Sequence, residues 1–220
     1  MELIIDTASV KDIRELNEIF MIDGVTCNPS IVCKEQKDFN VLMQAIVAEL
    51  KEEQTFFAEV LADNCDEMVK EAEYINSLKN NAYAKIPVSE EGLKAIKICH
   101  QKGIKTLATA VFTSLQGFLA AKNGAEYIAP YVNRMDNYMD GVEETLILQD
   151  MLRKNKMDSK VIAASFKNVN QIKQLIAYGI DSITITPEMF RKMYVHAGTD
   201  DAIKGFEEAW MKQYNRKTLL

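Results

Sequence analysis

The chain has 220 residues, of which 48% are hydrophobic, and its 32 acidic and 26 basic side chains give a formal net charge of −6. This length supports one sizeable hydrophobic core and no linker-like stretch interrupts it, so we expect a single domain over residues 1–220. The acidic balance without a basic face argues against nucleic-acid binding, and the lack of a leader pattern or a long apolar run predicts a cytoplasmic protein without a membrane partner.

Apolar, strand-like runs alternate with amphipathic, helix-like runs along the whole chain. The helix after the fourth strand is the most clearly bounded, because Ser89 can cap its start and Gly103 can end it. In chain order, the expected elements are strand 2–6, helix 9–20, a strand ending at 24–26, a loop opened by Asn28, helix 38–51, strand 55–60, helix 66–78, strand 82–86, helix 90–102, strand 105–111, a helix ending at Gly124, strand 127–132, helix 141–155, strand 160–164, a helix ending at Gly179, strand 182–186, a short helix from Pro187 and helix 199–214.

Eight strands that alternate with helices predict parallel pairing through right-handed crossovers, in an α/β protein. The sheet can close into a (β/α)8 TIM barrel or remain an open, doubly wound sheet. The strand count and the absence of a Gly-rich first turn favour the barrel. The additional helix 199–214 has an apolar stripe that must be buried, either on its own barrel or on a neighbouring subunit, and that consists of Ile203, Phe206, Trp210 and Tyr214.

Lys85 interrupts the apolar run from Tyr83 to Pro87, which reads as a buried strand. Burial disfavours the charged form of lysine, so such a residue is either tightly paired or kept partly neutral for chemistry. A salt-bridged or snorkelling side chain is the common arrangement for a single lysine in a strand. The residues that surround Lys85 must therefore decide its role.

In a barrel, the residues at the C-terminal ends of the strands face one shared site. A lysine there can be surrounded by two carboxylates, which could also form a purely structural buried ion network. The polar residues expected at these ends are Asp6, Thr26, Asn28, Glu59, Lys85, Thr109, Tyr131, Arg134, Ser165 and Lys167.

This set of side chains can carry out Schiff-base chemistry. Lowering the pKa of Lys85 from about 10.4 to near 7, which burial can produce, costs roughly 4 to 5 kcal/mol and yields a neutral amine that attacks a ketone. Glu59 and Thr109 could act on the departing water through a held water molecule. Asp6 is the candidate base for breaking the adjacent carbon–carbon bond.

The sequence carries no pattern for a metal or an organic cofactor. It has only two histidines, neither with a second ligand at helical or strand spacing, and it lacks the glycine-rich dinucleotide and P-loop motifs. Four cysteines without a C-x-x-C spacing are expected to be buried thiols in a reducing compartment, at Cys27, Cys33, Cys65 and Cys99.

The chain resembles the transaldolase family, in the small-subunit branch that also contains the fructose-6-phosphate aldolases. The resemblance implies a TIM barrel, Lys85 as Schiff-base lysine, Asp6 as acid/base, and Glu59 with Thr109 at the catalytic water. It further implies Asn28 and Ser165 near the dihydroxyacetone part, Arg134 near the phosphate, and no metal or organic cofactor. The segments that carry it are Leu3-Ile4-Ile5-Asp6-Thr7, Gly24-Val25-Thr26-Cys27-Asn28-Pro29-Ser30, Lys85-Ile86-Pro87-Val88, Gly103-Ile104-Lys105-Thr106, Ala129-Pro130-Tyr131-Val132-Asn133-Arg134 and Ala163-Ala164-Ser165-Phe166-Lys167.

Two positions of this resemblance point to different activities. Glu59 looks like the transaldolase residue, where the aldolases carry glutamine, and Tyr131 looks like the aldolase residue, where transaldolases carry phenylalanine. Because a phenol can help to protonate the enamine or position water, Tyr131 favours an aldolase that acts on fructose 6-phosphate. The alternatives are a transaldolase and, from another class, a non-catalytic barrel that binds sugar phosphates. The resemblance also implies a ring-based homo-oligomer, often a decamer, whose last helix reaches a neighbour.

Overall fold

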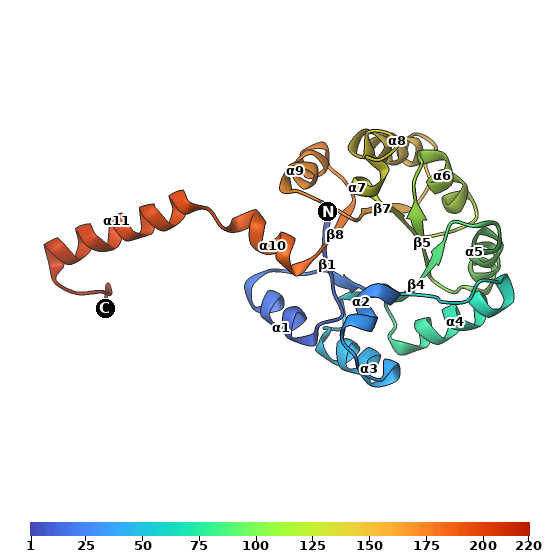
Figure 1. Cartoon of the computed structure of the whole chain (residues 1–220), viewed down its shortest axis with the longest axis horizontal. Helices are drawn as coiled ribbons and strands as arrows, with labels where there is room; N and C mark the ends of the chain where they lie inside the picture. The colour runs from blue at the N-terminus through green and yellow to red at the C-terminus, as the bar shows by residue number, and fades with distance from the viewer. The chain divides into compact units, whose positions relative to one another are not determined.

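The computed structural model describes residues 1–220. The chain divides into two compact units, Met1–Pro187 and Glu188–Leu220, and each is described by itself. The first unit is a closed barrel of eight parallel strands in sequential order, surrounded by helices (Figure 1). The strands are β1 (Glu2–Asp6), β2 (Gly24–Thr26), β3 (Thr55–Glu59), β4 (Ala82–Pro87), β5 (Thr106–Val111), β6 (Tyr127–Pro130), β7 (Lys160–Ala163) and β8 (Ser182–Ile185).

The barrel confirms the closed alternative of the expected α/β fold. All eight expected strands are present, and the helix predicted between Ser89 and Gly103 has the expected ends: Ser89 accepts a hydrogen bond from the Gly92 N–H at 3.0 Å, and Gly103 has φ +73°. The helices are α1 (Val10–Ile19), α2 (Pro29–Lys34), α3 (Phe39–Glu49), α4 (Cys65–Leu78), α5 (Glu90–Lys102), α6 (Ser114–Lys122), α7 (Val132–Met135), α8 (Gly141–Lys154), α9 (Val169–Tyr178), α10 (Pro187–Tyr194) and α11 (Ala197–Tyr214).

Two short helices replace segments that the sequence pattern assigned otherwise. The expected loop at Asn28 is the start of α2, because the Asn28 side chain caps the helix and Pro29 occupies its first position. The expected strand 127–132 ends at Pro130, and Tyr131 is the N-cap residue of α7. Both helices have six residues or fewer, and such short segments carry no clear helical period.

The layer of the barrel interior nearer the N-terminal ends of the strands is filled with aromatic and aliphatic side chains. Phe57 stacks on Tyr83 with ring centroids 5.0 Å apart, and Tyr127 meets Phe57 edge-on at 5.1 Å. Because strand side chains alternate, residues two positions further along face the same interior. The face shared by Phe57 and Glu59, and by Tyr83 and Lys85, is therefore the inner one. The buried members of this layer are Ile4, Phe57, Leu107, Tyr127, Ala129 and Ile162.

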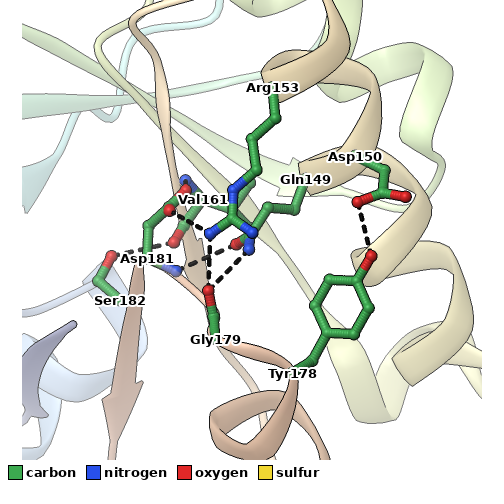
Figure 2. Close-up of polar contacts among 8 residues, drawn as sticks. All are labelled: Gln149, Asp150, Arg153, Val161, Tyr178, Gly179, Asp181 and Ser182. Carbon is green, nitrogen blue, oxygen red and sulfur yellow. Dashed lines mark hydrogen bonds and ion pairs between the residues drawn. The ribbon is translucent and has the colours of Figure 1, made fainter.

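Polar contacts attach α8 to the turn that precedes β8, as Figure 2 shows. Gln149 is fully buried; its amide group donates to the Gly179 carbonyl at 2.9 Å and accepts from the Asp181 N–H at 3.0 Å. Arg153 donates to the same carbonyl at 2.7 Å and to Asp181 at 3.1 Å. These contacts join α8 to the two residues Gly179 and Asp181, which lie just before the start of β8.

In the second unit, α11 has no buried residue. Within the unit, Trp210 packs against Tyr214 with ring centroids 4.3 Å apart, and the guanidinium of Arg216 lies 5.9 Å from the Trp210 ring centroid. Ile203 and Phe206, from the stripe predicted to need burial, are 51% and 72% exposed. The packing of this helix on a neighbouring subunit stays a prediction. None of the helices combines the length and apolar character needed to cross a membrane.

Candidate active site

Five of the proposed site residues lie toward the C-terminal ends of the neighbouring strands β1 to β5. Asp6 at the end of β1 pairs in register with Thr26 of β2, and Glu59 at the end of β3 pairs with Lys85 of β4. Thr109 of β5 pairs with Pro87. Because all strands are parallel, these ends surround one opening of the barrel.

The Lys85 ammonium is inside the barrel and does not snorkel to solvent. The residue is 5% exposed, and Nζ donates a hydrogen bond to the Cys27 carbonyl at 2.9 Å. Nζ also lies 3.3 Å from Glu59 Oε2 in an ion pair. A buried ammonium with a carboxylate beside it is held firmly in one position.

The pKa of Lys85 is raised above its ordinary value. Burial acts to lower it, but the carboxylates of Glu59 and Asp6 stabilise the ammonium and outweigh that effect. The sequence-based expectation of a lowered pKa is therefore wrong for this arrangement of charges. The apolar strand indicated burial, whereas the net direction depends on two carboxylates from other strands.

Glu59 has an oxygen with unused hydrogen-bonding capacity. Its Oε2 is buried and has no hydrogen-bond partner, because the contact with Lys85 Nζ is close enough for an ion pair without meeting hydrogen-bond geometry. A buried carboxylate oxygen is costly to leave without a donor. This oxygen can accept a hydrogen bond from a water molecule or a substrate hydroxyl beside Lys85.

The Asp6 carboxylate is held by a threonine on the neighbouring strand. Thr26 Oγ1 donates to Asp6 Oδ1 at 2.7 Å and lies 2.6 Å from Thr184 Oγ1 of β8. Thr184 was not among the residues singled out from the sequence. A threonine in a strand is common, and only its inward direction, which the sequence pattern did not reveal, connects it to the site.

Thr109 and Tyr131 form the opposite side of the opening. Their hydroxyl oxygens are 2.9 Å apart. The Tyr131 ring has two neighbours: the Arg134 guanidinium is 4.7 Å from its centroid, and the Phe112 ring meets it edge-on at 5.9 Å. The phenol is therefore positioned by contacts to its hydroxyl and to its ring.

An irregularity in β5 accompanies Thr109. Ala108 pairs with Ile128, but Val111 pairs with Pro130, so that β5 has one more residue than β6 between the two pairs. Ala110 has φ +55°, a backbone conformation that costs alanine about 1 to 2 kcal/mol. Such bulges often direct a side chain at a functional site. The sequence gives no sign of it, because Ala110 is not a glycine.

The remaining predicted site residues lie after the strands and make no direct contact with the Lys85 ammonium. Asn28 Oδ1 accepts from the Ile31 N–H at 3.0 Å, which leaves the amide NH2 as a donor. Ser165 follows β7 with φ +62°, and its carbonyl accepts from the Asn133 N–H at 2.9 Å. Arg134 in α7 and Lys167 are exposed cations.

The cysteines differ from the expectation at one position. Three of them are buried as predicted, but Cys33 is exposed because it lies on α2, which has no buried residue. Burial raises the pKa of the Cys27 thiol to about 12, so this thiol beside Lys85 stays protonated. No three potential metal ligands among His, Cys, Asp and Glu gather in one place.

Comparisons with known proteins relate this geometry to a family and to a fold. The family described as transaldolase/fructose-6-phosphate aldolase matches residues 3–219. A solved structure of a doubly substituted flavocytochrome b2 with sulfite bound is similar with a TM-score of 0.58 and 11% identity, over 84% of this chain and 56% of that chain. At this identity the likeness concerns the fold alone, and the chain spans little more than half of that structure's length.

Proposed function

Because the chain belongs to the transaldolase/fructose-6-phosphate aldolase family, we propose that it is a class I aldolase of fructose 6-phosphate. It cleaves and forms the C3–C4 bond and yields dihydroxyacetone and glyceraldehyde 3-phosphate. The choice of aldolase is supported by the Tyr131 hydroxyl, which lies 2.9 Å from Thr109 Oγ1 in the catalytic opening. The transaldolase alternative is supported by Glu59.

Lys85 is the proposed nucleophile. The Lys85 ammonium first gives a proton to Glu59 across the 3.3 Å ion pair, and the neutral amine attacks the C2 ketone of the sugar to form a carbinolamine. Glu59 returns this proton to the carbinolamine hydroxyl, which leaves as water and gives an iminium ion. Glu59 accepts a hydrogen bond from that water through Oε2, which pairs with Lys85 Nζ but has no hydrogen-bond donor within the chain, and Thr109 supplies a hydroxyl from β5, the strand next to that of Lys85. The same groups hold the water that later hydrolyses the iminium ion.

Asp6 is the proposed base for the cleavage step. It removes the proton of the C4 hydroxyl, the C3–C4 bond breaks, and the bond's electron pair neutralises the iminium ion as an enamine while glyceraldehyde 3-phosphate leaves as the aldehyde. Protonation of the enamine at C3 and hydrolysis then release dihydroxyacetone and the Lys85 amine. Thr26 holds Asp6 for this step through its 2.7 Å hydrogen bond.

The substrate's ends are assigned to the residues that follow the strands. The Asn28 amide NH2 and the Ser165 hydroxyl are proposed to bind the dihydroxyacetone part, and Arg134 is proposed to bind the phosphate. All bond changes described above use protein groups and water, so the proposal needs no metal or organic cofactor.

The first experiment uses borohydride to reduce a Schiff base in the presence of fructose 6-phosphate. A stable adduct is expected on the peptide that contains Lys85, and none in Lys85→Met. A non-catalytic barrel that binds sugar phosphates would give no adduct in either protein.

The second experiment separates aldolase from transaldolase. Fructose 6-phosphate is supplied without an aldose acceptor, and free dihydroxyacetone is measured. Steady release is expected. If the dihydroxyacetone unit appears only after transfer to added erythrose 4-phosphate, the protein is a transaldolase.

We further propose that the chain forms a ring-based homo-oligomer in which α11 packs on a neighbouring subunit. The support is the stripe of α11, where Phe206 remains 72% exposed. Light scattering of the full chain is expected to give a mass several times that of the monomer, and Phe206→Asp is expected to lower it. A monomeric wild-type protein would contradict this assembly.

A further inference from the structure

We propose that Thr184 is a positioning residue for the catalytic carboxylate of Asp6 and acts through Thr26; this inference rests on the proposed function. The three groups form one chain of contacts: Thr184 Oγ1 lies 2.6 Å from Thr26 Oγ1, which lies 2.7 Å from Asp6 Oδ1. Thr184 and Thr26 are 5% and 1% exposed, so solvent does not compete for their hydroxyls.

The direction of the hydrogen bonds follows from the number of protons. An ionised carboxylate only accepts, so Thr26 must use its one hydroxyl proton for Asp6. The Thr184 hydroxyl then has to donate to Thr26 across the 2.6 Å contact. The chain therefore has one polarity, from Thr184 through Thr26 to Asp6, and each bond strengthens the next.

The fold brings these hydroxyls together from both sides of β1. Thr26 is in β2, in register with Asp6, whereas Thr184 is in β8, in register with Ile4. Thr184 therefore contacts Thr26 from a position nearer the N-terminal ends of the strands than the Asp6 carboxylate. Since β2 and β8 are not neighbours in the barrel, this contact crosses in front of β1 and depends on barrel closure.

The arrangement assigns different tasks to the two oxygens of Asp6. Oδ1 accepts from Thr26, whereas Oδ2 makes no hydrogen bond within the chain. Oδ2 is then the oxygen that takes the proton from the C4 hydroxyl in the cleavage step. Loss of the Thr184 hydroxyl leaves Thr26 Oγ1 without its donor, which weakens the hydrogen bond from Thr26 that orients the Asp6 carboxylate toward the substrate.

The test compares Thr184→Val, which keeps the shape and removes the hydroxyl, with Thr184→Ser, which keeps the hydroxyl. The matched control is Thr106→Val, because Thr106 is fully buried in the same barrel and its hydroxyl has no partner. Two quantities are measured on each full-length protein: the extent of borohydride-trapped Lys85 adduct, and kcat for fructose 6-phosphate cleavage.

Thr184→Val is expected to lower kcat about 3- to 10-fold, the range of one net hydrogen bond, while the trapped adduct and KM stay unchanged. Thr184→Ser is expected to restore kcat to within about 2-fold, and Thr106→Val to match the wild type. Adding Thr184→Val to Thr26→Val is expected to cause no further loss, because Thr184 acts through Thr26.

Several results would overturn the inference. Thr184 would be shown only to fill space by any one of three results. The first is a kcat of Thr184→Val equal to that of Thr106→Val, and the second is an equal loss of trapped adduct and of turnover in Thr184→Val. The third is an additive loss of kcat in the double variant. If Thr184→Val does not fold, the trapped adduct and kcat are measured on Thr184→Ala instead. A wild-type protein without any Lys85 adduct would remove the proposed function and this inference together, whereas failure of Thr184→Val alone leaves the proposed function intact.

Discussion

Lys85 Nζ and Glu59 Oε2 lie 3.3 Å apart at paired positions of two neighbouring strands. The contact is inside the barrel, and it makes Glu59 the largest of the influences that raise the pKa of Lys85 against the lowering effect of burial. A protonated lysine is not a nucleophile, so in the proposed mechanism this pair sets the pH at which Lys85 reacts. The same carboxylate that is proposed to assist water therefore also delays formation of the neutral amine.

Glu59→Gln is expected to move the acid limb of the pH profile for Schiff-base formation to lower pH. The substitution removes a negative charge that favours the ammonium, so the pKa of Lys85 falls and more of the neutral amine is present at a given pH. The rate of borohydride trapping, measured from pH 5 upward, reports this midpoint separately from any loss of kcat.

A suitable control is Glu73→Gln, because Glu73 forms a comparable ion pair with Lys102, 2.8 Å apart, on the exposed surface. Its trapping profile should coincide with that of the wild type. An unchanged midpoint in Glu59→Gln would show that Glu59 does not set the protonation of Lys85.

Tyr131→Phe is expected to shift the products from free dihydroxyacetone toward transfer to an added aldose. The substitution removes the hydroxyl that contacts Thr109 and keeps the ring that contacts Arg134 and Phe112. The ratio of free to transferred dihydroxyacetone is measured with erythrose 4-phosphate present. Tyr138→Phe is the control, because Tyr138 also faces Phe112 but is 76% exposed. Equal ratios in the two variants would remove the main support for the aldolase proposal.

Ala110→Val is expected to lower the free energy of unfolding by about 1 to 3 kcal/mol, because a β-branched side chain is strained at φ +55°. Ala110→Gly should remain within about 1 kcal/mol of the wild type, since relief of strain and the greater freedom of glycine in the unfolded chain offset each other. Urea unfolding of both variants measures the difference. Equal stability of the two variants would show that the bulge tolerates branching.

Gln149→Met is expected to lower the free energy of unfolding by about 1 to 3 kcal/mol, because the part-buried Asp181 N–H loses the acceptor that the fully buried Gln149 provides (Figure 2). Tyr178→Phe, which removes an exposed hydrogen bond to Asp150 in the same region, should change it by less than about 0.5 kcal/mol. Both proteins should still form the Lys85 adduct. A Gln149→Met protein as stable as Tyr178→Phe would mean that water replaces the lost acceptor.

Much of the barrel could be predicted because its signals are local. Successive side chains of a strand point to opposite faces of the sheet. The position of a charged residue in an apolar run, such as Lys85 or Glu59, therefore indicates which of its neighbours share its face. Helix ends were equally readable where a cap stands at the right position, as at Ser89 and Gly103. The starts of α2 and α7 were missed because a turn of helix too short for periodicity resembles a loop or a strand end.

The sequence alone determined the eight strands, the lysine within one of them and the polar residue at the end of each neighbouring strand, since these depend on residues a few positions apart. Only the tertiary structure decided what those residues do to one another. It raised the pKa of Lys85 through carboxylates on two other strands, and it placed the Thr184 hydroxyl against Thr26, 158 positions away in the chain. Closing the barrel creates these contacts, and no local pattern encodes the distance between residues on strands that meet only across its interior.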